Sequence, residues 1–173
     1  MDQNLSRSAL LRGQWRSAKP PRRPPWALVD EAAFAAACTP SCGGRCVEAC
    51  PENILTLARD GRPQIQFKRG ECTFCAACVD ICPSGALTRQ GDTEPWSLTA
   101  RIAETCLSIA GVTGRSCGDA CGEDAIGFQL GLNGTARPTV DGETCTGCGA
   151  CVRPCPVDAI TMQAPVPAKE HAA

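Results

Sequence analysis

The stretch Cys145-Thr-Gly-Cys148-Gly-Ala-Cys151-Val-Arg-Pro-Cys155-Pro156 decides how this chain folds. Its cysteines follow the spacing C-x2-C-x2-C-x3-C, and a proline comes directly after the last one. Three soft sulfur ligands at this spacing can converge on three irons of one small cube, while the fourth reaches a second cube. Small residues fill the gaps, so backbone amides can approach the sulfides. The stretch therefore predicts thiolate ligands of an iron–sulfur cluster.

The same run occurs a second time in the chain, as Cys72, Cys75, Cys78 and Cys82 followed by Pro83. This spacing is typical of bacterial [4Fe–4S] ferredoxins. A structural zinc site is the alternative for a cysteine cluster, but zinc sites usually pair two C-x2-C arms across a longer gap. A compact run of four cysteines with a trailing proline fits that arrangement poorly.

Two further motifs depart from the standard spacing. Motif one has Cys38, Cys42, Cys46 and Cys50 before Pro51, and its first two gaps hold three residues instead of two. Motif three offers only Cys106, Cys117 and Cys121, because isoleucine and valine occupy the ligand positions at 109 and 112. We expect a [4Fe–4S] cluster at motif one and an incomplete ligand set at motif three.

The segments after the four motifs repeat, at offsets of about 32, 39 and 34 residues. Alternating apolar residues predict strands at 54–57, 65–67, 96–102 and 138–140, and an alanine-rich segment predicts a helix at 30–37. Asp60-Gly61 indicates a type I′ hairpin turn, and Asn133-Gly134 lies near the turn of a second hairpin. The predicted fold class is α+β: tandem two-cluster bacterial ferredoxin-like domains, with short β-hairpins and short helices around iron–sulfur clusters.

The repeat also divides the chain. We expect a basic flexible N-terminal arm at residues 1–29 and a first ferredoxin-like domain with motifs one and two at 30–91. A second ferredoxin-like domain with motifs three and four follows at 92–163, and a tail at 164–173.

In two-cluster ferredoxins the fourth cysteine of each motif crosses to the other cluster. The expected sets are Cys38, Cys42, Cys46 and Cys82; Cys72, Cys75, Cys78 and Cys50; Cys106, Cys117 and Cys155; and Cys145, Cys148, Cys151 and Cys121. We expect three [4Fe–4S] clusters. The three-cysteine site has three open interpretations: a [3Fe–4S] cluster, a [4Fe–4S] cluster with water or a carboxylate on the fourth iron, or no stable cluster.

The amino-acid composition indicates in which cellular compartment the chain works and which kinds of chemistry it can perform. Fifteen cysteines in 173 residues would suit a disulfide scaffold in a secreted protein, but the N-terminus has no apolar signal core and the count is odd. We therefore expect a cytoplasmic, metal-binding chain that does not span a membrane. No catalytic residue is expected, since His171 is the sole histidine and no nucleotide-binding glycine motif is present.

Charge is distributed unevenly along the chain. Residues 1–26 carry a net charge of about +5, which leaves about −6 on the remainder of a chain with a net charge of −1. A basic arm on an acidic body does not indicate nucleic-acid binding by that body; it could dock on an acidic partner or an anionic membrane surface. The alternatives are a solvated tail, or a Trp26 that folds back onto the first cluster domain.

Four ferredoxin-type motifs, together with Arg12-Gly-Gln-Trp15-Arg16 and Arg23-Pro-Pro-Trp26, resemble the NapF family of periplasmic nitrate reductase systems. The resemblance covers nearly the whole chain. It implies a cytoplasmic iron–sulfur protein that acts on the molybdenum-containing catalytic subunit before export, by electron delivery or help with that subunit's cluster. The residues that would contact the partner are Arg12, Trp15, Arg16, Arg22, Arg23 and Trp26. In the family pattern motif three carries a further cysteine, where this chain has Gly114.

Two other functions remain open at this point. The chain could be a generic electron-carrying polyferredoxin subunit of a larger redox complex. It could instead be a chaperone or adaptor whose clusters serve only to fold it.

Overall fold

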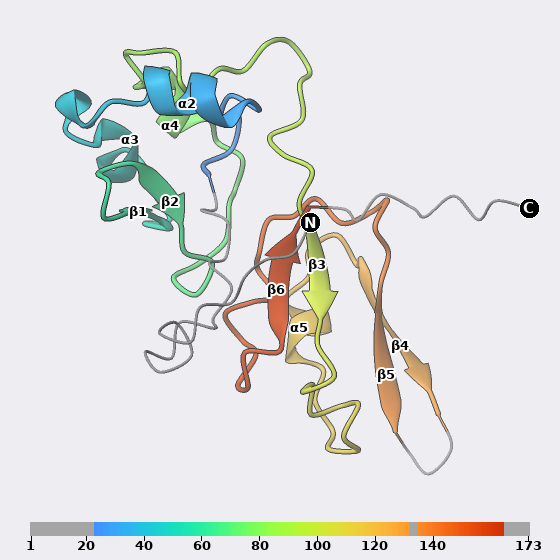
Figure 1. Cartoon of the computed structure of the whole chain (residues 1–173). Helices are drawn as coiled ribbons and strands as arrows, with labels where there is room; N and C mark the ends of the chain where they lie inside the picture. Colours follow the sequence, from blue (N-terminus) through green and yellow to red (C-terminus); the bar gives the residue numbers. More distant parts are fainter. Residues whose placement is uncertain (1–22, 132–134, 165–173) are drawn as a thin grey trace, which may run out of the picture.

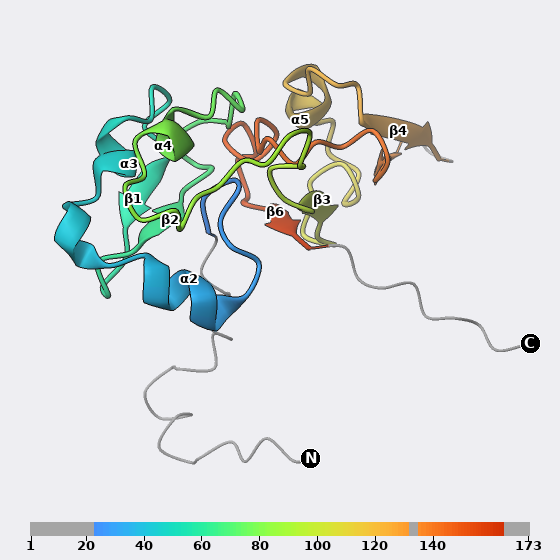
Figure 2. The same ribbon diagram turned by 90° about the horizontal axis from the view of Figure 1, so that it is seen from above.

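The computed structural model describes residues 23–131 and 135–164 (Figures 1 and 2). We refer to residues 23–91 as the N-terminal half and to 92–164 as the C-terminal half. Both halves are built from short elements, with three two-stranded antiparallel sheets in the described residues. The protein is therefore a mixed α+β structure, as the cysteine spacing predicts.

The N-terminal half begins with helix α2 (Glu31–Ala37), which matches the predicted helix closely. The Asp30 side chain caps it by accepting a hydrogen bond from the Ala33 N–H at 2.7 Å. Phe34 is the buried residue of this helix, so α2 packs on the half through one aromatic side chain. Three one-turn helices follow, η1 (Pro40–Cys42), α3 (Arg45–Glu48) and α4 (Ala77–Asp80).

The first hairpin joins β1 (Leu55–Leu57) to β2 (Pro63–Ile65) in antiparallel register. A hairpin at Asp60-Gly61 was predicted correctly, but the predicted type I′ turn is wrong. Gly61 has a φ of 78°, whereas Asp60 is not among the described residues with positive φ. The Gly61 N–H donates to Ala58 O, so the loop is longer than two residues and needs glycine at one position only.

The C-terminal half contains β3 (Thr99–Ile102), α5 (Ser116–Asp119), β4 (Ile126–Leu130), β5 (Ala136–Val140) and β6 (Ile160–Gln163). Strands β4 and β5 form the expected second hairpin; residues 133 and 134 of its turn lie outside the described residues. Strand β3 pairs with β6, the last strand of the half (Figure 1). It is shorter than the predicted 96–102 because β6 pairs only with residues 99–102.

The start and the end of the N-terminal half also pair with each other, as β3 and β6 do in the C-terminal half. Ala27 forms an antiparallel bridge with Leu87, and the Thr88 N–H donates to Trp26 O at 2.8 Å. Trp26 is only 6% exposed, and its indole Nε1–H donates to Thr93 O at 2.9 Å. Residues 23–29 therefore pack on the body of the protein, whereas the sequence interpretation placed them in a flexible arm.

The hydrophobic core is shared between the two halves. It runs from Phe34, Leu55 and Phe67 in the first half to Ala100 and Ile160 in the second. Ten cysteines contribute to this core or pack against it, so the apolar side chains surround the thiols. A division into domains at 30–91 and 92–163 remains a proposal, which the separate hairpins of the two halves support.

Candidate metal centre

The loops that carry the cysteines alternate between right-handed and left-handed backbone. In motif two, Phe74 and Ala76 have φ of 53° and 60°; in motif four, Gly147 and Gly149 at the same offsets have φ of 75° and 84°. Such alternation points successive backbone N–H groups into one concavity, which is a known way to bind an anionic group, iron–sulfur clusters included. The loop geometry therefore suits an anionic cluster.

The four fourth-cysteine segments share a second backbone feature. The third residue after each fourth cysteine has positive φ: Asn53 at 54°, Gly85 at 68°, Asp124 at 51° and Asp158 at 54°. Asn, Asp and Gly are the residues that tolerate this conformation best. The repeat noticed in the sequence is thus a repeated tight turn, and the residue types at this offset were the signal from which it could have been inferred.

The first thiol set is Cys38, Cys42, Cys46 and Cys82, which line one hollow in the N-terminal half. Gly43 and Gly44 both have positive φ and take up the extra residue in the widened second gap of motif one. Burial first, and then the nearby thiols of Cys38, Cys42 and Cys82, together raise the pKa of Cys46 to about 11. The structure thus brings together the four cysteines that were assigned to this set from the sequence.

Cys82 differs from Cys38 and Cys46 of its set because the hydrogen bonds to its sulfur lower its pKa more than burial raises it. Burial alone would raise its pKa, but backbone N–H groups of Leu87, Ser84 and Ala86, with the Ser84 hydroxyl, donate to the sulfur and lower the pKa overall. The Ser84 Oγ lies 3.7 Å from the Cys82 Sγ. Hydrogen bonds to a thiolate are one means by which a protein tunes a cluster's potential.

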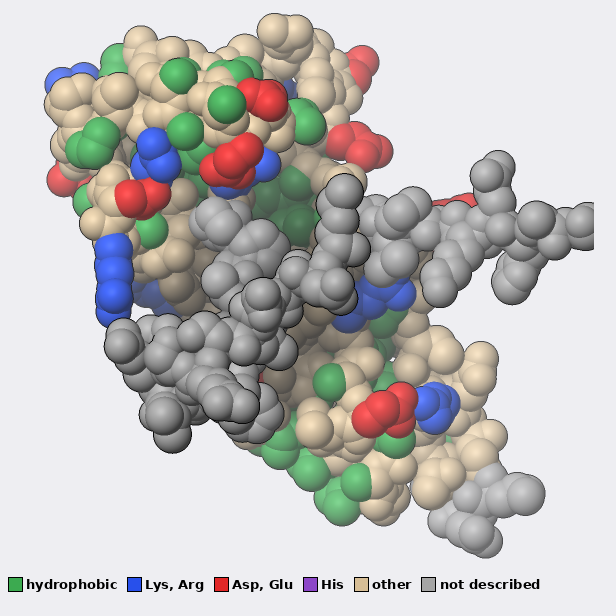
Figure 3. All heavy atoms as spheres, in the orientation of Figure 1, with side chains coloured by type: hydrophobic (Ala, Val, Ile, Leu, Met, Phe, Trp, Pro, Cys, Tyr) green, Lys and Arg blue, Asp and Glu red, His purple; other side chains and the backbone are tan. Residues whose placement is uncertain are grey.

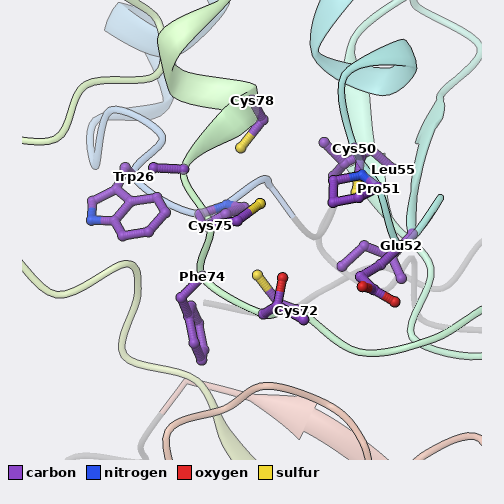
Figure 4. Close-up of a pocket in the computed structure, with 13 residues that line it drawn as sticks. Trp26, Cys50, Pro51, Glu52, Leu55, Cys72, Phe74, Cys75 and Cys78 are labelled. Carbon is purple, nitrogen blue, oxygen red and sulfur yellow. The ribbon is translucent and has the colours of Figure 1, made fainter.

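The second thiol set is Cys50, Cys72, Cys75 and Cys78, and Figure 4 shows these four side chains around one hollow. Trp26 covers one edge of this hollow together with Phe74 (Figure 4). Burial first, and then the nearby thiols of Cys72, Cys46, Cys50 and Cys75, together raise the pKa of Cys78 to about 12. Cys50 therefore crosses from motif one to the set of motif two.

The fourth thiol set is Cys121, Cys145, Cys148 and Cys151, which line a hollow in the C-terminal half. Burial first, and then the nearby thiols of Cys148, Cys145, Cys117 and Cys121, together raise the pKa of Cys151 to about 12. Asp141 orients the start of this motif, since its carboxylate accepts from the Glu143 N–H and the Thr144 hydroxyl. Those two hydrogen bonds lower the pKa of Asp141.

The third thiol set is Cys106, Cys117 and Cys155. Burial raises the pKa of Cys117, and the thiols of Cys106 and Cys155 contribute to the increase, so the three thiols lie close enough to interact. The Ala159 N–H donates to the Cys155 Sγ at 3.3 Å. Gly114, the position at which the family pattern has a cysteine, has ordinary φ, and a Cβ there would meet only Val112 O at 4.0 Å.

The donor chemistry of these sets fits iron–sulfur clusters. All fifteen cysteines are free thiols, so none is used in a disulfide. Three sets supply four thiols each around a hollow, which is the ligand number of a [4Fe–4S] cluster. No group of three or more His, Cys, Asp or Glu in residues 23–131 and 135–164 converges as a site for a single metal ion.

The residues predicted to contact a partner divide into two groups. Arg12, Trp15, Arg16 and Arg22 lie outside the described residues. Arg23 is engaged internally: it donates to Leu28 O, pairs with Glu31 at 3.3 Å and stacks over the Phe34 ring. Arg23 and Trp26 therefore hold the start of the N-terminal half in place. Of the alternatives that the sequence left open, this agrees with the one in which Trp26 folds back onto the first cluster domain.

The visible surface carries no extended field of one charge. Figure 3 shows Lys or Arg and Asp or Glu side chains interspersed on one face of both halves. In the described part of the chain, no helix has the length and apolar character needed to cross a membrane.

Two family models match the cysteine motifs. Residues 37–86 match a 4Fe-4S dicluster domain, and residues 138–161 match a 4Fe-4S binding domain. Together with the thiol sets, these matches define the chain as a ferredoxin-type iron–sulfur protein.

Curated relatives narrow the class. The chain is 40% identical over 160 residues to the ferredoxin-type protein NapF of Escherichia coli (strain K12), covering 92% of this chain and 95% of that protein. It is 40% identical over 140 residues to NapF of Haemophilus influenzae, covering 81% and 77%. The ferredoxin-type protein NapG of Escherichia coli (strain K12) is 35% identical, covering 77% and 65%. The chain belongs to the NapF family of ferredoxin-type proteins, as the resemblance in its sequence indicated.

Proposed function

We propose that this protein is a cytoplasmic electron-transfer and maturation factor for the molybdenum-containing catalytic subunit of periplasmic nitrate reductase, acting before that subunit is exported. The observation that carries the proposal is the similarity to NapF over 92% of this chain and 95% of that protein. Clusters bound at the thiol sets would supply one-electron redox chemistry.

The chain's own residues support a role in passing electrons rather than in transforming a substrate. The hollows of the first, second and fourth sets are small and lined by cysteines and apolar side chains, so they fit clusters and leave little room for another molecule. The thiols are mostly buried or half-buried, with Cys75 of the second set exposed. Cys75 therefore offers the second set a short path to a partner's surface.

The basic segment before residue 23 supplies the proposed contact with the catalytic subunit. Arginine and tryptophan are the side chains that most often dominate binding energy at interfaces. Of the six residues assigned to this contact from the sequence, Arg12, Trp15, Arg16 and Arg22 remain candidates, since Arg23 and Trp26 are engaged within the protein.

The test is co-purification without oxygen of the full chain with a tagged catalytic subunit that retains its export signal. An Arg12→Glu/Arg16→Glu variant should lose the complex and keep the wild-type cluster spectrum. The matched control is Arg137→Glu, which reverses an exposed charge far along the chain and should retain the complex. Binding that is equal in all three proteins contradicts the proposed contact, and absence of any complex contradicts the proposed partner.

A further inference from the structure

A single hydrogen bond joins ligand residues of the two halves. The Cys72 N–H donates to Cys148 O at 2.9 Å. Cys72 is the first cysteine of motif two and belongs to the second thiol set, while Cys148 belongs to the fourth. The second and fourth sets therefore abut through the backbone of their own ligands.

Aromatic packing flanks this joint. Phe67, which is 1% exposed, meets Trp96 edge-on with ring centroids 5.9 Å apart, and Phe74 meets Trp96 at 5.7 Å. The Trp96 Nε1–H donates to Thr146 O at 3.1 Å. Gly149 lies directly under the Phe67 ring, where any Cβ would overlap ring atoms. Phe67 is therefore the buried side of the joint, whereas Trp96 and Phe74 are half-buried and border a hollow open to solvent.

We propose that the Cys72–Cys148 joint, flanked by Phe67, Trp96 and Gly149, is the one-electron route between the two halves. This inference rests on the proposed electron-transfer function. Clusters held by the second and fourth sets would exchange one electron across this joint, so that one would be oxidised as the other is reduced. No covalent bond forms or breaks and no proton has to move. A low-potential one-electron donor at either end supplies the electron.

The joint is tested on the full chain with its clusters, reduced with dithionite and examined by electron paramagnetic resonance. Unpaired spins on adjacent reduced clusters broaden one another's signals. Gly149→Ala places a methyl group against the Phe67 ring and should separate the halves. Gly43→Ala is the matched control, because Gly43 also has positive φ in a cysteine loop but a Cβ there meets nothing within 4 Å.

We expect the wild type and Gly43→Ala to share a broadened spectrum, and Gly149→Ala to lose part of the broadening at equal iron content. Identical spectra for all three proteins overturn the proposal.

If Gly149→Ala loses iron, charge reversals at two exposed ion pairs replace it. Lys68→Glu replaces an ion pair between the two halves by two negative charges, at residues 68 and 158. Arg137→Glu does the same to the ion pair with Glu104 within the C-terminal half. If the route is correct, Lys68→Glu should narrow the resonance signals and Arg137→Glu should not. Equal spectra for these two variants overturn the proposal. If the spectra are equal but the protein still binds the catalytic subunit, the route is refuted and the proposed function is not.

Discussion

Replacing Trp26 by alanine tests whether residues 23–29 belong to the folded body. Trp26 is 6% exposed, borders the second thiol set and lies under the Arg89 guanidinium, 5.4 Å from its ring centroid. Truncation of a buried tryptophan to alanine typically costs about 3–5 kcal/mol. The indole donates to Thr93 O, and Thr93 is exposed, so water can replace this hydrogen bond in the variant. We therefore expect a loss of unfolding free energy at the lower end of this range, about 3 kcal/mol.

The assay follows loss of cluster absorbance in guanidinium chloride without oxygen. With a slope of about 3 kcal/mol per molar denaturant, the midpoint of Trp26→Ala should fall by about 1 M. Since cluster loss is irreversible, the rate of bleaching at fixed denaturant is measured as well. The control is Val29→Ala in the same segment, where the side chain is 92% exposed and no change is expected.

Equal midpoints and bleaching rates for Trp26→Ala and Val29→Ala would refute this reasoning. That result would mean that residues 23–29 are a flexible arm, as the sequence alone suggested. A large effect of both variants would also contradict it, because it would make the exposed Val29 side chain part of the packing.

Three further predictions concern the thiol sets. Ser84→Ala removes a hydrogen bond to the Cys82 sulfur. The reduction potential of the first cluster should therefore become more negative by on the order of tens of millivolts in a redox titration. A more positive potential would contradict this prediction. Gly114→Cys should add a fourth ligand to the third set, so iron per chain should rise and any [3Fe–4S] signal should disappear; unchanged iron would show that residue 114 does not reach this site. Removal of iron and sulfide should leave the chain largely unfolded, because ligand binding supplies folding energy in small metal domains, and a native-like circular dichroism spectrum of the iron-free chain would refute this.

The grouping of the thiols in the first, second and fourth sets could be predicted because cysteine spacing is a short-range chemical constraint; cluster binding by these thiols stays a prediction. The crossing of Cys50 and Cys82 between motifs follows from the two-cluster arrangement, and the structure brings these cysteines to the sets expected. Helix α2 was also predictable, since an alanine-rich run with Asp30 before it needs no distant partner.

What could not be predicted depends on contacts between distant residues. Trp26 is buried because its backbone and indole bond to residues 88, 93 and 95, and no local pattern reveals such partners. The joint between Cys72 and Cys148 is hidden for the same reason. The turn at Asp60-Gly61 failed for a local reason: Asp-Gly suits more than one turn type, and the strand ends selected the longer loop.

The central claim is that the first, second and fourth thiol sets each hold a [4Fe–4S] cluster. The most direct measurement is iron and acid-labile sulfide per chain in protein purified without oxygen, with zinc determined on the same sample. Three complete sets predict at least about 12 irons per chain with matching sulfide, and more if the third set is also loaded. About 8 irons or fewer, or zinc in place of sulfide-bound iron, would contradict the account.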